Sequence, residues 1–568
     1  MCLLALLAGI VGGVGAWVFR MLIGFVHNTL FLGNPVFVYD ANVHTPAGPW
    51  GIGVIAVPVF GGLVVAWLVK TFAPEARGHG VPEVMDAIYY QEGRIRPRVA
   101  IIKSVASAIS IGSGAAVGRE GPIIQIGSAF GSMLGQIVTM PARQRIVLIA
   151  AGSGAGIAAT FNAPLGGIIF AIELLLISVS ATNVLLVGIA TVTATHIGRL
   201  LLGTSPSFNI PQLASVEVHL HPAAILGILV LLGIVMGLVS VLFIRGLYWA
   251  EDRFDALPGN YYSRHALGML CVGIMMYLLM RYSGHYYVQG VGYATIVDIL
   301  TGVLSDPWFL LLLFVLKLMA TCLSLGSGAS GGVFSPALFM GATVGAAYGQ
   351  LVVQFFPELH AAIPAFAIAG MAAAIGGTTG AVLTGIVMLT EMTADQSVVL
   401  PLIVVVLTAA AVRRDIMRES IYTLKLLRRG KVVPEGLQAA ITSASRVRDV
   451  MRTDVTIVER NDPDTADAWV LSPNNTVSIT DTTDHRLATL PYIVAEADDN
   501  FVATLQRLHF TGAQIILVTS ESSEVQARNI VGVVGSHEIA RHTESYWLPC
   551  SSRQRVCLAA RSGNMPGR

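Results

Sequence analysis

The fold is decided by the stretch GSGAAVGREGPIIQIG at Gly112–Gly127, a glycine-rich interruption of an apolar chain. A second such stretch, GSGASGGVFSP, lies at Gly326–Pro336. Each joins a glycine loop to a proline and an apolar helix. Backbone within a bilayer must be hydrogen-bonded, so breaks like these persist only inside protein or beside a water-filled cavity. Transporters build substrate sites at such breaks, and we interpret the two stretches as corresponding elements of an inverted internal repeat.

The sequence around these stretches is that of a membrane protein. Hydrophobic residues make up 54% of the 568 and charged residues only 12%, where a soluble domain carries about 25% charged residues. Several runs approach the ~20 apolar residues of a membrane-spanning helix. The clearest runs are Gly51–Lys70, Ala223–Leu242, Leu310–Ser324 and Val398–Val412. These features predict an all-α polytopic membrane protein with two inverted-topology halves and broken helices.

A more polar region follows this apolar body. Residues 1–443 hold 42 charged side chains, whereas the much shorter segment 444–568 holds 27. Short strand patterns at Gln514–Thr519 and Asn529–Val534, with a helical pattern at Phe501–Leu508, favour a small α/β unit. The expected division is a membrane domain, a basic linker, a folded tail and a disordered end, at residues 1–430, 431–445, 446–545 and 546–568.

Positive charge at the junction sets the orientation. Lysine and arginine cluster after the last apolar run, which is typical of the cytoplasmic side of a membrane. The members of this cluster are Arg413, Arg414, Arg418, Lys425, Arg428, Arg429 and Lys431. We expect the tail to be cytoplasmic.

The chemistry of the first glycine stretch lies in GREGP, at Gly118–Pro122. A glycine loop that opens a helix leaves free N–H groups at the positive end of the helix dipole, which together form an anion site. Arg119 adds positive charge. Glu120 would compete with the anion, and becomes a gate if it swings out on protonation. The structural alternative is a helix start with a salt-bridged Arg119–Glu120 pair.

The other interruptions offer further anion donors. GGVFSP provides uncharged amides at Val333 and Phe334, which can hold an anion without trapping it; its alternative role is close helix packing. GHGVPEV contains His79 and is also consistent with an ordinary turn. The Tyr422 hydroxyl could donate to an anion, although tyrosine is also common at membrane interfaces.

Few other ionisable residues lie in or beside the apolar segments. They are Lys103, Glu173, Lys317 and Glu391. Each is a functional candidate or half of a buried pair, and structural pairing is expected for Lys317 and Glu391. Histidines are sparse and the five cysteines scattered, so we predict no metal site, no disulfide framework and no catalytic cluster.

Together the motifs resemble the ClC family of chloride channels and proton/chloride exchangers. Three signatures occur in order, as Gly78–Pro82, Gly118–Pro122 and Gly332–Pro336, with FNAPLGG at Phe161–Gly167. The stretch GHGVPEVMDAIYY is most similar to the bacterial ClcB-type subgroup. The resemblance covers about residues 1–430. It implies a homodimer in the bacterial inner membrane with one pore per subunit.

The resemblance also implies residue roles. Glu120 looks like the external gating glutamate. The anion would be held by Gly118, Arg119, the amides of Val333 and Phe334, and the Tyr422 hydroxyl. The tail resembles a degenerate CBS domain, which opens at Val447–Met451 and has its better repeat at Phe501–Arg541. Chloride is the expected ligand, no cofactor is expected, and nucleotide binding by the tail is left open.

Two positions depart from the family pattern. His79 stands where the family usually has serine, which alters selectivity and pH response because histidine titrates near neutral pH. Leu174 stands at the position that we align with the internal proton-transfer glutamate, next to Glu173. A proton path would therefore use Glu120 with Glu173 or His79.

These departures favour a passive chloride channel gated by Glu120 through voltage or pH. The alternative is a coupled proton/chloride antiporter. A more remote alternative is a transporter of organic solutes, which would need a roomy polar cavity, and a membrane enzyme is not expected.

Overall fold

The computed structural model describes residues 1–177, 179–204, 208, 221–431 and 433 of the N-terminal part of the chain. In the C-terminal part it describes residues 446–455, 457–458, 469–472, 476–479, 488–499, 501–511, 513–520, 529–535 and 538–539. The predicted disordered end, 546–568, and most of the predicted linker lie outside the described residues. The chain divides into two compact units, Met1–Leu437 and Gln438–Arg568.

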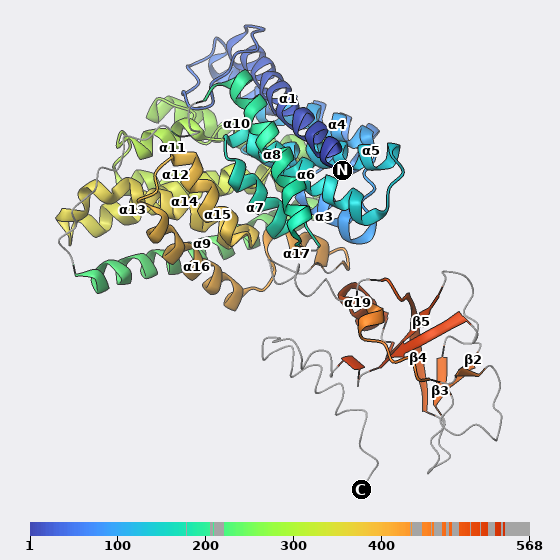
Figure 1. The fold of residues 1–568 in the computed structure, drawn as a ribbon. Coiled ribbons are helices and arrows are strands. Elements are labelled where there is room, and N and C mark those ends of the chain that lie inside the picture. Colours follow the sequence, from blue (N-terminus) through green and yellow to red (C-terminus); the bar gives the residue numbers. More distant parts are fainter. Residues whose placement is uncertain are drawn as a thin grey trace. The chain divides into compact units, whose positions relative to one another are not determined.

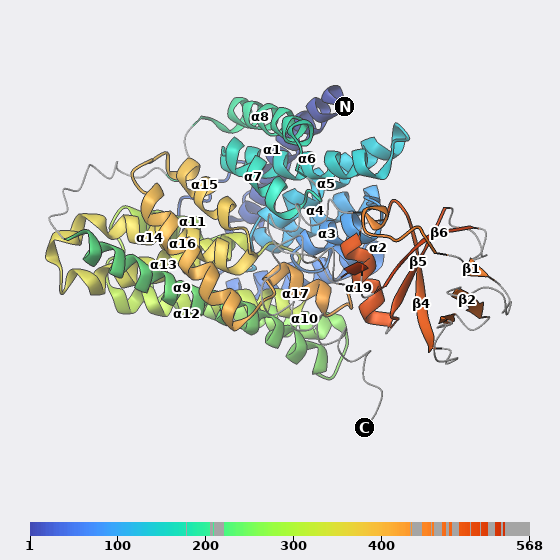
Figure 2. The same ribbon diagram turned by 60° about the horizontal axis from the view of Figure 1, so that its bottom comes forward.

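The described residues of the first unit form helices joined by loops (Figures 1 and 2). Its first eight helices are α1 Cys2–His27, α2 Ala56–Phe72, α3 Val81–Tyr90, α4 Pro97–Gly112, α5 Glu120–Ile137, α6 Ala142–Phe161, α7 Pro164–Leu174 and α8 Ala181–Leu202. The others are α9 Pro222–Ala256, α10 Tyr261–Ser283, α11 Tyr293–Leu300, α12 Pro307–Ser327, α13 Phe334–Val353, α14 Ile363–Thr379, α15 Val382–Thr393, α16 Val399–Ile416 and α17 Ile421–Leu427.

Helix length explains the interrupted apolar pattern. Among the described residues, nine helices are long and apolar enough to cross a membrane. Others are too short: α7 has 11 residues and α15 has 12, where a span needs about 20. Proline is the first residue of α7, and Asn162 just before it adopts a left-handed conformation. The apolar runs are therefore split between crossing and partly crossing helices, as the sequence predicts.

The helices form two halves with the same order of long and short elements. Helices α3 to α8 correspond one to one with α11 to α16. Glycine packing repeats as well: a Cβ on Gly127 would lie 2.0 Å from the carbonyl oxygen of Gly152, and a Cβ on Gly341 would lie 2.4 Å from that of Gly370. Only glycine allows α5 on α6, and α13 on α14, to approach so closely.

Two reciprocal contacts join the halves about an approximate two-fold axis. Gly118 donates its N–H to the oxygen of Gly332 over 2.7 Å and accepts the N–H of Gly332 over 2.6 Å. Glu173 at the end of α7 caps the start of α15, while Glu391 in α15 caps the start of α7. The predicted inverted repeat is therefore confirmed.

The second unit contains one sheet and a helix. Its described strands are β1 Ile457–Val458, β2 Trp469–Ser472, β3 Thr476–Ile479, β4 Ala488–Glu496, β5 Ile515–Thr519 and β6 Ile530–Val534. They lie in the order β1 to β6, with parallel pairing between β1 and β2 and between β4 and β5. Helix α19, Phe501–Thr511, connects β4 to β5. This small α/β unit fits the predicted CBS-like tail.

Candidate functional site

The centre of the site is the carboxylate of Glu120, the first residue of α5, which is fully buried. It accepts a hydrogen bond from the Tyr293 hydroxyl over 2.7 Å and from the Ser335 backbone N–H over 3.2 Å. The Ser335 hydroxyl also donates to it. Ser335 is the second residue of α13, so a negative charge lies at the positive end of that helix. The carboxylate therefore occupies an anion position.

The starts of α5 and α13 meet through the paired Gly118 and Gly332. Val333 and Phe334, predicted to bind the anion, are the cap and first residue of α13, and both are buried. The ring of Phe334 packs against Phe161 at the end of α6, with ring centres 5.7 Å apart. The glycine pair thus brings the first two predicted anion motifs to one place.

Glycine at position 118 leaves room for the carboxylate of Glu120. A Cβ there would lie 2.2 Å from Oε2 of Glu120. We expect Gly118→Ala to displace the flexible carboxylate and leave the fold intact. Loss of one hydrogen bond to a charged group, worth about 1.5–3 kcal/mol, should raise chloride flux at neutral pH by about tenfold or more, measured in liposomes. Gly332→Ala is the contrasting variant, because its Cβ would meet the backbone nitrogen of Gly121 at 2.8 Å and should impair folding. Unchanged or lower flux in folded Gly118→Ala would contradict this role.

The contacts of Arg119 differ from the Arg119–Glu120 salt bridge of the structural alternative. Its guanidinium lies 5.1 Å from the ring centre of Tyr293, and among the described residues no ion pair joins it to Glu120. The cation stacks on the ring whose hydroxyl donates to the Glu120 carboxylate. Arg119 therefore supports the site through Tyr293.

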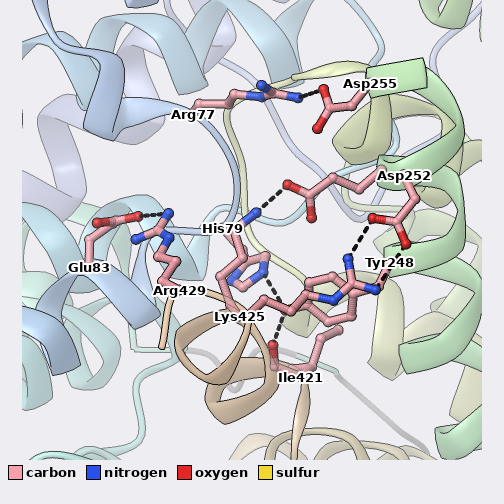
Figure 3. A network of polar contacts seen from close by, with 11 residues as sticks. Arg77, His79, Glu83, Tyr248, Asp252, Asp255, Ile421, Lys425 and Arg429 are labelled. Atoms are coloured by element: carbon pink, nitrogen blue, oxygen red, sulfur yellow. Dashed lines mark hydrogen bonds and ion pairs between the residues drawn. The ribbon is translucent and has the colours of Figure 1, made fainter. Parts of the chain in front are cut away.

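The third predicted motif places His79 just before α3. The His79 ring is 5% exposed and its centre lies 5.9 Å from that of Tyr422, in α17. Its Nε2 is 3.4 Å from the hydroxyl of Tyr248, in α9, and that hydroxyl also donates to the carbonyl oxygen of Ile421 (Figure 3). His79 and Tyr422, predicted from two distant segments, are thus brought together with an unpredicted tyrosine, Tyr248.

A charged cavity of about 530 Å³ lies beside this cluster, between α3, α9 and α17. Ion pairs tie its walls together (Figure 3). They are Arg77–Asp255, Lys425–Glu251, Arg428–Asp252 and Arg429–Glu83. Hydrogen bonding to Glu83 raises the pKa of the Arg429 guanidinium, which keeps this cation charged.

Sequence reasoning missed three residues of the site. Ser335 lies inside the GGVFSP motif, so its hydroxyl could have been considered. Tyr293 directly follows the loop that holds Gly290 and Gly292. This loop corresponds to the GHG loop of the other half, and the correspondence is visible only once the two halves are aligned. Tyr248 lies in the long apolar run of α9 and carries no motif.

The carboxylate of Glu173 accepts hydrogen bonds from the start of α15. It accepts backbone N–H groups from Leu383 and Thr384 over 3.0 and 2.9 Å, and the Thr384 hydroxyl over 2.8 Å. Leu174 beside it is buried. Glu391 does the same for Leu165 and Gly166 over 3.1 and 2.7 Å. The structure thus gives both glutamates helix-capping contacts, and the predicted proton role of Glu173 stays a prediction.

We expect Glu173→Gln and Glu391→Gln to lower the free energy of unfolding by similar amounts, about 1–3 kcal/mol, because each loses charge-assisted hydrogen bonds to a helix start. Thermal unfolding in detergent measures this. Proton transport per chloride should remain at the wild-type value in both. Selective loss of proton transport in Glu173→Gln would instead assign this carboxylate to the proton path.

Comparison with known proteins identifies the family. The model of the family described as "Voltage gated chloride channel" matches residues 61–414. The chain belongs to this CLC family. It is 35% identical over 392 residues to the H⁺/Cl⁻ exchange transporter ClcA of Vibrio cholerae, covering 67% of this chain and 80% of that one. These matches do not specify a subgroup, so the ClcB resemblance stays a prediction.

Solved structures agree with a CLC fold. A slow cyanobacterial Cl⁻/H⁺ antiporter superposes with a TM-score of 0.65 at 28% identity, over 75% of this chain and 97% of that one. A eukaryotic CLC transporter superposes with a TM-score of 0.63 at 19% identity, over 94% and 97%. Family and candidate spans confirm a multi-pass integral membrane protein, and anion transport follows from the family. The bacterial relatives agree with an inner-membrane location.

Proposed function

We propose that this CLC protein exchanges chloride for protons across the membrane, with Glu120 as the group for which the two ions compete. One observation carries the proposal: the Glu120 carboxylate accepts the Ser335 N–H at the start of α13. A chloride ion needs such donors. Protonation removes the charge from the carboxylate, so the side chain leaves and the anion can bind. Deprotonation reverses this, which links proton release to anion displacement.

The named relatives support exchange over passive conduction. The similar Vibrio cholerae protein is called an exchange transporter, and the cyanobacterial structure is called an antiporter. The sequence favoured a channel because Leu174 cannot carry a proton. That inference assumed that protons could reach Glu120 only by way of the position of Leu174. Exchange needs a proton route to Glu120, but it does not need this particular one. The antiporter, first held as the alternative, is therefore the better-supported function.

The rest of the site has supporting roles in this proposal. Val333, Phe334, Tyr422 and His79 hold the anion along its path. The cavity beside α17 lies next to the basic cluster that sequence reasoning places on the cytoplasmic side. This cavity is the cytoplasmic entrance of the anion path. The protein works as a homodimer with a cytoplasmic tail that modulates transport.

Purified protein in liposomes tests the proposal. A chloride gradient is imposed without an initial pH difference across the membrane. The membrane potential is clamped at a value at which protons have no passive driving force. Chloride flowing down its gradient should drive protons the opposite way, uphill. Chloride flux with no proton movement above that of protein-free liposomes would establish a passive channel.

A further inference from the structure

We propose that His79 is a second proton-binding residue of the anion path, and that a proton on its Nδ1 and a small monovalent anion bind there together. The inference rests on the proposed function and deepens it, because it adds a proton site to Glu120.

Hydrogen-bond direction fixes the form of neutral His79. The Tyr248 hydroxyl has one proton, which it donates to the carbonyl oxygen of Ile421. In its 3.4 Å contact with His79 Nε2, the Tyr248 oxygen must therefore accept. Neutral imidazole carries one N–H, so the proton lies on Nε2 and Nδ1 keeps a bare lone pair.

That lone pair is buried without a partner. His79 is 5% exposed, and its Nδ1 has no hydrogen-bond partner among the described residues. The Oε1 of Gln125, on α5, is likewise unpartnered and buried, and lies 2.9 Å from where a Cβ of Gly80 would be. Unpaired buried polar atoms are costly, so two of them flanking Gly80 indicate that something is bound there during function. A bare lone pair repels an anion, whereas a protonated Nδ1 donates to it.

His79 is also connected to the gate. Its carbonyl oxygen packs on Gly121, the residue after Glu120: a Cβ on Gly121 would lie 2.2 Å from this oxygen. On its other side lies the ring of Tyr422. His79 therefore lies on the route between Glu120 and the segment of α17.

The surrounding charges make proton and anion depend on each other. Three cations act electrostatically on His79: Lys103 of α4, Lys425 of α17 and the neighbouring Arg429. The hydroxyl of Tyr248 in α9 and the ring of Tyr422 in α17 contact its ring. Lys425 and Arg429 are paired with Glu251 and Glu83, whereas Lys103 bonds backbone carbonyls of Ala76 and Gly78.

Adding a proton to His79 beside these cations is opposed by like charge, and a neighbouring anion offsets that repulsion. Anion binding thus promotes proton uptake, and by linkage rising pH must weaken anion binding. A site made of amides and a serine hydroxyl would lack this dependence, because none of these groups titrates near neutral pH.

The test uses full-length protein carrying Glu120→Gln, which removes the proton of the gate from the measurement. Chloride is titrated into this variant by calorimetry, in buffers of different ionisation enthalpy, between about pH 5 and 8. We expect proton uptake on chloride binding, and an affinity that falls by up to about tenfold per pH unit on the alkaline side. Adding His79→Ser should abolish both the uptake and the pH dependence.

His265 provides the matched control. It is also fully buried with an unpartnered Nε2 among the described residues, but it lies in α10 against Ser327. Adding His265→Ser should leave proton uptake unchanged. Uptake that survives His79→Ser, or pH-independent affinity in Glu120→Gln, would overturn the proposal. Failure of exchange itself would show instead in the liposome assay of the wild type.

Discussion

Replacing Glu120 with glutamine should leave chloride flux open at every pH and abolish proton transport. Glutamine has the shape of the protonated gate and no charge to compete for the Ser335 N–H and the hydroxyls of Ser335 and Tyr293. At saturating chloride, where a lower affinity at high pH has little effect on flux, chloride efflux from liposomes should then vary little with pH, while proton movement should fall to the level of protein-free liposomes.

The matched control for this variant is Glu173→Gln, another buried glutamate made neutral. It should retain the wild-type dependence of chloride flux on pH. If Glu120→Gln shows the wild-type pH profile, Glu120 is not the gate.

Removing either buried lysine should cause the largest loss of stability. Lys103 Nζ donates to the carbonyl oxygens of Ala76 and Gly78 over 2.9 and 2.5 Å. Lys317 Nζ makes the same contacts in the other half, with Val288 and Gly290 over 2.9 and 2.7 Å. Lys103→Met or Lys317→Met keeps most of the volume but removes two buried hydrogen bonds to a loop, at about 2–4 kcal/mol. The carbonyls of Ala76 and Gly78 each keep one other donor, the Ser330 hydroxyl and the Gly331 N–H.

Thermal unfolding of the purified variants in detergent measures this loss. Similar destabilisation is expected in both, because the two lysines hold equivalent loops. Lys70→Met is the control, since Lys70 is exposed on α2 and should change stability little. Variants with methionine at 103 and 317 that unfold like the wild type would show that these contacts do not hold the loops.

The same lysines show where sequence reasoning reached its limit. An ionisable residue in an apolar segment predicts a functional group or half of a buried pair, and structural pairing was expected for Lys317. The actual partners are backbone carbonyls of loops that precede α3 and α11. Backbone acceptors leave no mark in a sequence, so only the fold could identify them.

One part of the candidate site was predictable, namely the meeting of its two glycine motifs. Glycine loops followed by proline mark helix starts, and the structure brings Gly118 and Gly332 into direct contact. The sequence pattern could not identify the groups that donate hydrogen bonds to the Glu120 carboxylate. Tyr293 lies 173 residues away along the chain, outside any motif considered.

The preference for a channel had a local cause. Leu174 occupies a single position of the family pattern, and the lack of a carboxylate there removes only one possible proton route. The cluster of His79, Tyr248 and Tyr422 is assembled from three distant segments, so an alternative proton site was only weakly visible before the fold was known.

The reversal potential of the purified protein, measured in a bilayer under crossed chloride and proton gradients, tests the central claim most directly. With a fixed chloride gradient, an exchanger must shift its reversal potential when a pH gradient is added, by a fixed fraction of about 59 mV per pH unit. We predict such a shift in the wild type and none in Glu120→Gln. A wild-type reversal potential that follows the chloride gradient alone at every pH gradient would contradict exchange.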